Sequence, residues 1–179
     1  MKEPRIILLD GSVDEASAMR TVLKLLDFDK QDSKEEISLY INSPGGSILH
    51  GLAIYDTIKH ISAPVSTVCY GMAASMGAFL LSCGKKGRRF ALPHSRVLIH
   101  QPLIYVQNGF QSSQTELKRT AESLLKSREI LEEIMAENIG VSLEKIHADC
   151  ERDNWMSAEE ALEYGIIDGI LSGKGKVVG

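Results

Sequence analysis

The chain has 179 residues, of which 44% are hydrophobic and 25% charged, and its formal net charge is −4. This composition is typical of an ordinary globular protein that is long enough to bury one sizeable core. The acidic balance, with no block of basic residues, argues against nucleic acid as a partner. No apolar stretch approaches the roughly 20 residues that a membrane helix needs, so we expect no membrane association.

Three cysteines, Cys69, Cys83 and Cys150, lie far apart in the sequence and form no Cys-x-x-Cys pair. This spacing indicates neither a zinc site nor a disulfide framework. The N-terminus also lacks the layout of a signal peptide. We therefore expect buried, reduced thiols in a cytoplasmic protein.

The first two-thirds of the sequence alternates between short apolar runs and amphipathic segments, which favours an α/β fold with parallel strands and right-handed crossovers. In the first helix, Ser12 and Glu15 predict a capping box. Its apolar stripe is predicted to contain Val13, Ala16, Met19, Val22, Leu23 and Leu26. The predicted strands are 5–9, 37–41, 65–70, 89–91 and 96–99, and the predicted helices are 12–28, 48–60 and 72–83.

The last third begins with an irregular stretch, 101–113, followed by a long amphipathic helix over about 113–140 that Ser113 and Glu116 are expected to cap. A helix of this length, against a mean of about 11–12 residues, is expected to project and to bury its stripe against another subunit. A short helix over 142–150, a helix from Ser157 to Gly165 and a strand over 166–171 follow. Residues 172–179 are expected to form a flexible tail.

Ser75 is the first candidate for chemistry. It lies among small residues in Gly-Met-Ala-Ala-Ser-Met-Gly-Ala, residues 71–78, where the backbone is able to turn tightly from strand to helix. A serine at a helix start is exposed to unpaired N–H groups that stabilise a nearby negative charge. The alternative is a structural role in which Ser75 caps a helix that packs close to the sheet.

A second candidate is the turn Ser-Pro-Gly-Gly at 43–46, which follows a predicted strand and precedes a helix. Adjacent glycines let the backbone approach a ligand closely, so their N–H groups are suited to an oxyanion hole. The alternatives are a structural turn or a phosphate-binding turn, although the sequence of a P-loop is absent.

His100 ends the apolar strand 96–99, at the rim of a parallel sheet, where sites usually lie. Imidazole suits the role of a general base near neutral pH. A structural histidine is the alternative. An acidic partner is harder to choose, because the pattern of residues does not separate Asp149 from Asp153. No clustered metal-ligand pattern is present, so we expect no metal.

Together these segments resemble the ClpP family of ATP-dependent protease subunits, and the resemblance spans about residues 5–171. It is carried by Tyr-Ile-Asn-Ser-Pro-Gly-Gly at 40–46, the segment 71–78, Ile-His-Gln-Pro at 99–102 and Glu-Arg-Asp at 151–153. Further matches are Ser-Ala-Glu-Glu-Ala at 157–161 and Tyr-Gly at 164–165.

The resemblance implies an α/β fold of the ClpP/crotonase-like kind, with repeated β-β-α/β-α-β units, a mostly parallel sheet and a projecting handle helix. It implies a single serine peptidase domain over 1–179, with a head at about 1–102 and 141–171, a handle at about 103–140 and a tail at 172–179. Ser75 would be the nucleophile, His100 the general base, and Asp153 rather than Asp149 the residue that orients the base. Gly46 and Met76 match the positions whose N–H groups form the oxyanion hole.

The resemblance also implies a self-compartmentalising barrel of two stacked seven-subunit rings that degrades unfolded polypeptides. A ClpX-type or ClpA/ClpC-type AAA+ unfoldase would feed the barrel and use the ATP, so this chain would need no cofactor. Arg152 matches a position of ring–ring contact. The positions that match those of unfoldase docking are Tyr40, Tyr70, Phe90 and Leu92.

The sequence departs from the family pattern at several points. It begins almost at the first strand, which predicts either a shortened axial gate or a trimmed chain. Ser38 and His60 stand where larger apolar docking residues are expected, and Ile104-Tyr105 replaces a glycine pair beside the substrate-binding strand. The remaining alternatives are a catalytically silent ring subunit that supports an active paralogue and a crotonase-type acyl-CoA enzyme.

Overall fold

The structure is a computed structural model, and it describes residues 4–102, 114–173 and 176–178. Its centre is a sheet of order β1-β2-β3-β4-β7-β8, from which β5 branches by pairing with β3 and β6. Pairings among β1, β2, β3, β4 and β7, and between β3 and β5, are parallel. The β5–β6 and β7–β8 pairs are antiparallel. The predicted α/β fold with a mostly parallel sheet is confirmed.

The bounds of the described strands are β1 Ile6–Asp10, β2 Ile37–Ser43, β3 Val65–Ala74, β4 Arg89–Ala91, β5 Arg96–Ile99, β6 Asn154–Ser157, β7 Gly169–Ser172 and β8 Lys176–Val178. The bounds of the described helices are α1 Glu15–Gln31, α2 Ile48–His60, α3 Met76–Ser82, α4 Gln114–Ile139, α5 Leu143–Asp149 and α6 Ala158–Tyr164.

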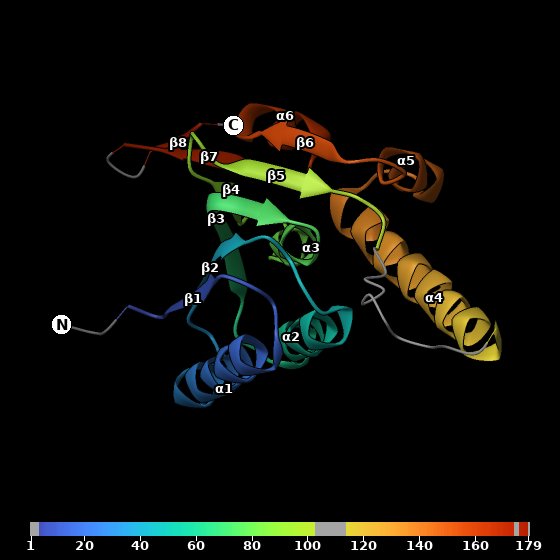
Figure 1. Cartoon of the computed structure of the whole chain (residues 1–179). Helices are drawn as coiled ribbons and strands as arrows, with labels where there is room; N and C mark the ends of the chain where they lie inside the picture. Colours follow the sequence, from blue (N-terminus) through green and yellow to red (C-terminus); the bar gives the residue numbers. More distant parts are fainter. Residues whose placement is uncertain (1–3, 103–113, 174–175, 179) are drawn as a thin grey trace.

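Helices α1 and α2 cover one face of the sheet at β1 and β2 (Figure 1). Strand β1 shows why they do so: its side chains alternate, with Ile7 and Leu9 almost fully buried and Ile6 and Leu8 exposed. Helix α3 lies between the sheet and α4, and all its residues are buried. The core therefore lies on the helical side of the sheet, and the opposite face carries exposed apolar side chains on β1 and half-buried side chains on β2.

Helix α1 differs from its prediction in its cap and in its buried face. Its N-cap is Asp14, whose carboxylate accepts the N–H of Ser17 at 2.8 Å, so the predicted box of Ser12 and Glu15 is wrong. The buried residues are Ser17, Ala18, Thr21 and Leu25. The predicted stripe residues Met19, Leu23 and Leu26 are instead 58%, 59% and 43% exposed. Ser17 and Thr21 tolerate burial because their hydroxyls donate to backbone carbonyls.

Two boundaries near the site also differ from the prediction. Strand β3 continues to Ala74, and α3 begins only at Met76, because residues 72–74 pair with β5. No element was predicted between the helix over 142–150 and the helix from Ser157, but residues 154–157 form strand β6 beside β5. At the C-terminal end, the predicted flexible tail contributes β8, which pairs with β7. Helix α6 begins as predicted after Ser157, which forms a capping box with Glu160.

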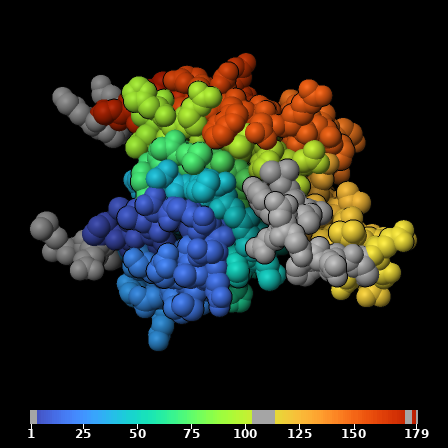
Figure 2. Space-filling model, viewed as in Figure 1, coloured from blue at the N-terminus to red at the C-terminus, as the bar shows by residue number. Residues whose placement is uncertain are grey.

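Helix α4 contacts the head through its C-terminal part, where Met135, Ala136 and Ile139 are buried. Toward its N-terminus, Leu117, Leu125 and Ile130 are 52%, 59% and 46% exposed. The helix extends away from the sheet and forms a projection (Figures 1 and 2). Its predicted cap at Ser113 lies outside the described residues. Within the described part of the chain, no helix is both long and apolar enough to cross a membrane.

Candidate active site

Ser75 occupies the one-residue turn between β3 and α3. Its φ is 55° and its ψ −120°, and among the described residues it is the only non-glycine residue with positive φ. Such a conformation costs energy and is characteristic of strained turns at functional sites. The turn is held in place because the Ser75 N–H donates to the Leu98 carbonyl at 2.8 Å and its carbonyl accepts from Phe79 N–H at 3.0 Å. The hydroxyl makes no capping hydrogen bond, which disfavours the structural alternative.

His100 and Asp153 face each other just beyond the ladder between β5 and β6. The outermost ladder pair is Ile99 with Asn154, so the next residues along the two antiparallel strands are His100 and Asp153. The Nδ1 atom of His100 lies 3.7 Å from the Asp153 Oδ1 atom. The His100 side chain is 13% exposed and that of Asp153 67%.

Asp149, the other acidic candidate, lies elsewhere. Its carboxylate accepts hydrogen bonds from Lys145 at 2.8 Å and from the Tyr164 hydroxyl at 2.7 Å. Burial tends to raise the pKa of Asp149, but the hydrogen bond from Lys145 is the larger effect, and the pKa lies below its ordinary value. The structure therefore places Asp153, and not Asp149, beside His100.

The Gly45–Gly46 turn lies directly against Ser75. Gly45 has φ 97°, and a Cβ built on it would lie 2.7 Å from the Ser75 Cβ and 2.8 Å from the Ala74 carbonyl oxygen. Gly46 has φ 150°, and a Cβ there would lie 2.3 Å from the Val13 carbonyl oxygen. Hydrogen bonds from Val13 N–H to Gly45 and from Ser47 N–H to Val13 hold the turn in place. This close approach requires two glycines.

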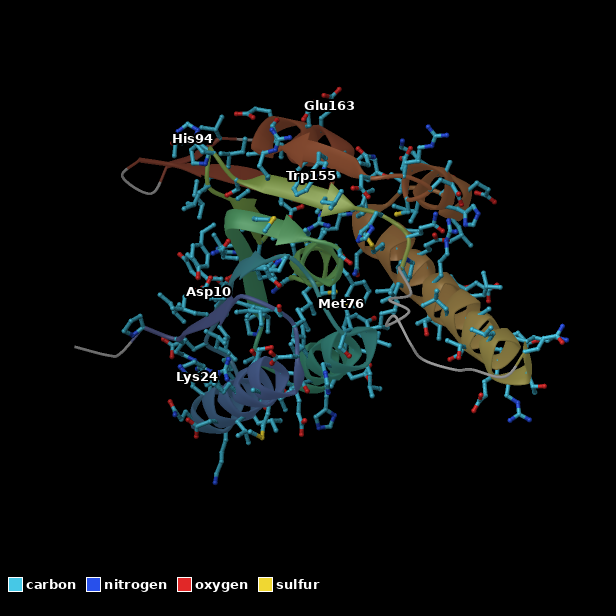
Figure 3. All side chains as sticks on the ribbon, viewed as in Figure 1. Asp10, Lys24, Met76, His94, Trp155 and Glu163 are labelled. Carbon is cyan, nitrogen blue, oxygen red and sulfur yellow. The ribbon has the colours of Figure 1, made fainter. Side chains whose placement is uncertain are left out.

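One cavity of about 380 Å³ joins these parts. Ser75, His100 and the turn at 44–46 line it together with residues of α3 and α4. Its apolar wall consists of Ile48, Met76, Phe79, Leu98, Leu131 and Met135. Figure 3 shows Met76 on the side of α3 that faces α2, and a Cβ on Gly51 of α2 would lie 2.2 Å from its sulfur atom. The cavity suits an apolar side chain next to the serine.

The three cysteines are free and buried, as expected from the sequence. Burial raises the pKa of Cys69 to about 11 and those of Cys83 and Cys150 to about 12. Cys150 lines the cavity, but a thiol with so high a pKa is a poor nucleophile at neutral pH. Within the described residues, no group of three or more His, Cys, Asp or Glu side chains could hold a metal ion.

The residues predicted for assembly and docking lie on the surface and across the sheet. Arg152 is exposed next to Asp153. Tyr40 and Tyr70 are half-buried, and their ring centroids are 6.1 Å apart. Phe90 is half-buried and Leu92 is 38% exposed. Ser38 lies in the same face and contacts Ser66 at 3.0 Å, His60 ends α2, and Ile104-Tyr105 lies outside the described residues.

Sequence reasoning missed two residues that the structure brings to the site. Gln101 follows His100, and its side chain accepts a hydrogen bond from Arg128 of α4 at 3.1 Å. The motif at 99–102 contains Gln101, so the sequence could have indicated it as a site residue. Arg128 occupies an ordinary position on an amphipathic helix, and nothing in the sequence marks it as part of the site. Their contact joins the handle to the site.

Substituting Gly45 with alanine is expected to lower kcat by about 100-fold, because the new methyl group would push against Ser75 and the site tolerates about 1 Å of displacement poorly. Steady-state hydrolysis of a fluorogenic peptide measures the loss. The matched control is Gly87→Ala: its φ is 82°, but nothing lies within 4 Å of a Cβ there. That variant carries comparable backbone strain and is expected to keep its kcat; a Gly45→Ala protein with normal kcat would contradict the assignment.

Comparisons with known proteins agree with this geometry. The family described as Clp protease matches residues 1–174 of the chain. Over 168 residues, the chain is 53% identical to the ATP-dependent Clp protease proteolytic subunit of Streptococcus pneumoniae (strain 70585), an alignment that covers 94% of this chain and 85% of that protein. The chain therefore belongs to the Clp protease family, and it is a serine peptidase. The catalytically silent alternative is not favoured.

Proposed function

We propose that this chain cleaves peptide bonds by acyl transfer, with Ser75 as nucleophile, His100 as general base and Asp153 as the residue that orients the base. The observation that carries the proposal is the shared cavity: Ser75, His100 and the Gly45–Gly46 turn line one space, with a carboxylate beside the imidazole. These are the parts of a serine peptidase triad, which is recognised by geometry rather than by position in the chain.

In this mechanism His100 acts first as a base and then as an acid, while Asp153 orients its ring. The Nδ1 atom of His100 faces Asp153, which leaves Nε2 to take the proton from the Ser75 hydroxyl. The Ser75 oxygen attacks the peptide carbonyl, and the imidazolium returns the proton to the leaving amine. Water then hydrolyses the acyl-enzyme with His100 again as base. The 3.7 Å separation of His100 and Asp153 is longer than a hydrogen bond, and such contacts commonly tighten when substrate binds.

Backbone N–H groups of Gly46 and Met76 are proposed to stabilise the oxyanion. Met76 is the first residue of α3, where N–H groups have no acceptor within the helix. Gly46 follows Gly45 in the turn beside Ser75, and a side chain on Gly45 would touch Ser75. Each donor of this kind contributes about 100- to 1,000-fold to kcat in acyl transfer.

The surfaces support assembly into the two-ring barrel. Leu117, Leu125 and Ile130 on α4 are exposed apolar side chains that a second ring would cover, and Arg152 is exposed as well. The uncovered sheet face supports docking of an AAA+ unfoldase, because it carries apolar and aromatic side chains. The apolar and aromatic side chains on this face are Leu8, Tyr40, Tyr70, Phe90 and Leu92. On this proposal ATP is used by the unfoldase, so the chain itself needs no cofactor.

We also propose that the protein works in the cytoplasm on unfolded polypeptides. Three free, buried cysteines support a reducing compartment, where disulfides are rare. A peptidase whose active sites face an enclosed chamber cleaves only chains that are delivered unfolded.

A fluorophosphonate probe tests the proposed nucleophile. The purified protein should incorporate one probe per chain, and peptide mapping should place the adduct on Ser75. Light scattering on the same sample should give fourteen times the chain mass of 19.7 kDa. A full-size barrel that hydrolyses no peptide and takes up no probe would contradict the proposal.

Cleavage of a short peptide is expected to fall as the pH is lowered into the acidic range, because a protonated imidazole cannot accept a proton from serine. The measurement is kcat/KM from pH 5 to 9, with light scattering at each pH to show that the assembly persists. A rate that stays constant down to pH 5 would exclude His100 as the base.

A further inference from the structure

Arg128 of α4 contacts the two segments that carry the proposed base and its carboxylate partner. Its Nη1 donates to the side-chain oxygen of Gln101 at 3.1 Å, and its Nη2 donates to the carboxylate of Glu151 at 2.8 Å. Gln101 directly follows His100, and Glu151 precedes Asp153 by two residues. One guanidinium group therefore spans the gap between the two chain segments.

This gap lies where the regular pairing of β5 with β6 has ended. The last ladder pair is Ile99 with Asn154, and His100 and Asp153 lie beyond it. Gln101 ties the segments together there: its N–H donates to the Cys150 carbonyl at 2.6 Å and its side-chain amide donates to the Glu151 carbonyl at 3.0 Å. Thus His100 and Asp153 lie between the ladder on one side and the Gln101 contacts on the other.

The guanidinium is itself fixed in orientation. Its Nε donates to Glu132, one turn further along α4, at 2.6 Å, and its Nη2 also donates to the His147 carbonyl at 3.3 Å. Glu132 is in turn 2.8 Å from the His147 ring. The Arg128 and Glu132 side chains are only 11% and 7% exposed. A planar, rigid fork with this many partners sets distances more closely than a flexible ammonium group does.

We propose that Arg128 is a positioning residue for catalysis: by bridging Gln101 and Glu151, it sets the separation of His100 from Asp153. This inference rests on the proposed function, since it assigns Arg128 a role through that pair. Arg128 acts on the rate of acyl transfer and not on substrate binding, although it also lines the cavity.

The principal test is Arg128→Lys, which keeps the positive charge but cannot bridge both acceptors as a fork. We expect kcat for a fluorogenic peptide to fall by about 100-fold, the effect of a misplacement of about 1 Å, while KM stays within about twofold. The rate of fluorophosphonate labelling of Ser75 should fall by a similar factor. Light scattering should still give the mass of the assembled ring.

A second variant, Gln101→Met, keeps the charge network of Arg128, Glu132 and Glu151 and removes the hydrogen bonds that the Gln101 side chain makes with Arg128 and with the Glu151 carbonyl. It is expected to lower kcat by about tenfold. The double variant should lose little more than Arg128→Lys alone, because both changes break the same connection and such effects are not additive. Gln101→Met remains informative if Arg128→Lys fails to assemble.

Asn138→Ala is the control for a contact that only holds α4 against the head. The Asn138 amide contacts Ser82 at 3.4 Å and the Cys83 sulfur at 3.7 Å, so it joins α4 to the head at a point away from the triad. It should lower the thermal unfolding midpoint while leaving kcat within about twofold. Equal losses of kcat in Asn138→Ala and Arg128→Lys, at equal loss of stability, would overturn the inference.

Two other results would also overturn it. An Arg128→Lys ring with normal kcat and labelling rate would show that the bridge is not needed, and a raised KM with normal kcat would show that Arg128 contacts substrate instead. In both cases the wild-type protein labels at Ser75, so the proposed function stands. Wild-type protein that takes up no probe would overturn both the proposed function and this inference.

Discussion

Replacing Ser75 with alanine is expected to lower peptide-hydrolysis kcat by about a million-fold, the loss typical of a missing serine nucleophile. Fluorophosphonate labelling should disappear completely. The fold should persist, because the change removes one hydroxyl that makes no capping bond and keeps the N–H contact to Leu98. Hydrolysis, intact mass after labelling and light scattering measure the three quantities on one preparation.

Ser62→Ala is the matched control, since Ser62 is an exposed serine whose backbone N–H, rather than its hydroxyl, contacts Asp29. Its kcat and labelling should equal those of the wild type. If the Ser75→Ala protein kept more than about a thousandth of the wild-type kcat, another residue would have to be the nucleophile.

The second large effect concerns stability and comes from Asp168, in the turn before β7. Its carboxylate pairs with Arg89 of β4 through contacts of 2.6 Å and 2.8 Å and accepts the N–H groups of Gly87 and Arg89. The side chains of Arg89 and Asp168 are only 3% and 17% exposed. Asp168→Asn would leave a buried guanidinium without its counter-charge, so unfolding free energy should fall by about 3 kcal/mol, measured by urea denaturation.

Lys118→Gln provides the comparison for an exposed pair. Lys118 and Glu122 lie 3.9 Å apart on α4 with side chains 77% and 57% exposed, so their pairing should contribute less than about 1 kcal/mol. Similar losses of unfolding free energy in Asp168→Asn and Lys118→Gln would contradict the prediction that the buried pair stabilises the fold more than the exposed pair does.

The same carboxylate gives stability a defined pH dependence. Burial alone would raise the pKa of Asp168, but the hydrogen bonds and charge of Arg89, with the N–H of Gly87, outweigh it and hold the pKa below 3.8. Because the folded protein lowers this pKa, the contribution is complete above the ordinary carboxyl pKa and is lost as the pH falls through the folded value. Wild-type stability should therefore fall more steeply than that of Asp168→Asn below about pH 4.

The sequence predicted the parts of the site but not all of the geometry that joins them. The segment 71–78 and the glycine turn were candidates for a site between a strand and a helix, and for each of them a purely structural role was the alternative. The turn itself was predicted four residues too early, since pairing of residues 72–74 with β5 decides where β3 ends. That pairing joins residues more than 20 positions apart, and no local pattern reports it.

The acidic partner shows the same limit. The local pattern of residues did not separate Asp149 from Asp153, and only the family resemblance favoured Asp153. In the structure, strand β6, for which no element was predicted, leads Asp153 to His100. Four residues are too few for a clear alternating pattern, so β6 had no local signal. Likewise the exposed Met19, Leu23 and Leu26 followed a helical period that local sequence favours, but packing on the sheet selected another face of α1.

Helix α4 has a consequence for how the protein responds to dilution. Its C-terminal turns rest on the head, whereas its apolar side chains nearer the N-terminus have no covering within the described chain. Isolated helical segments are marginal in water, so on the proposed assembly this segment gains its order from the opposite ring. The stability of α4 would then rise with subunit concentration, and separation of the rings would destabilise the part of α4 that carries Arg128.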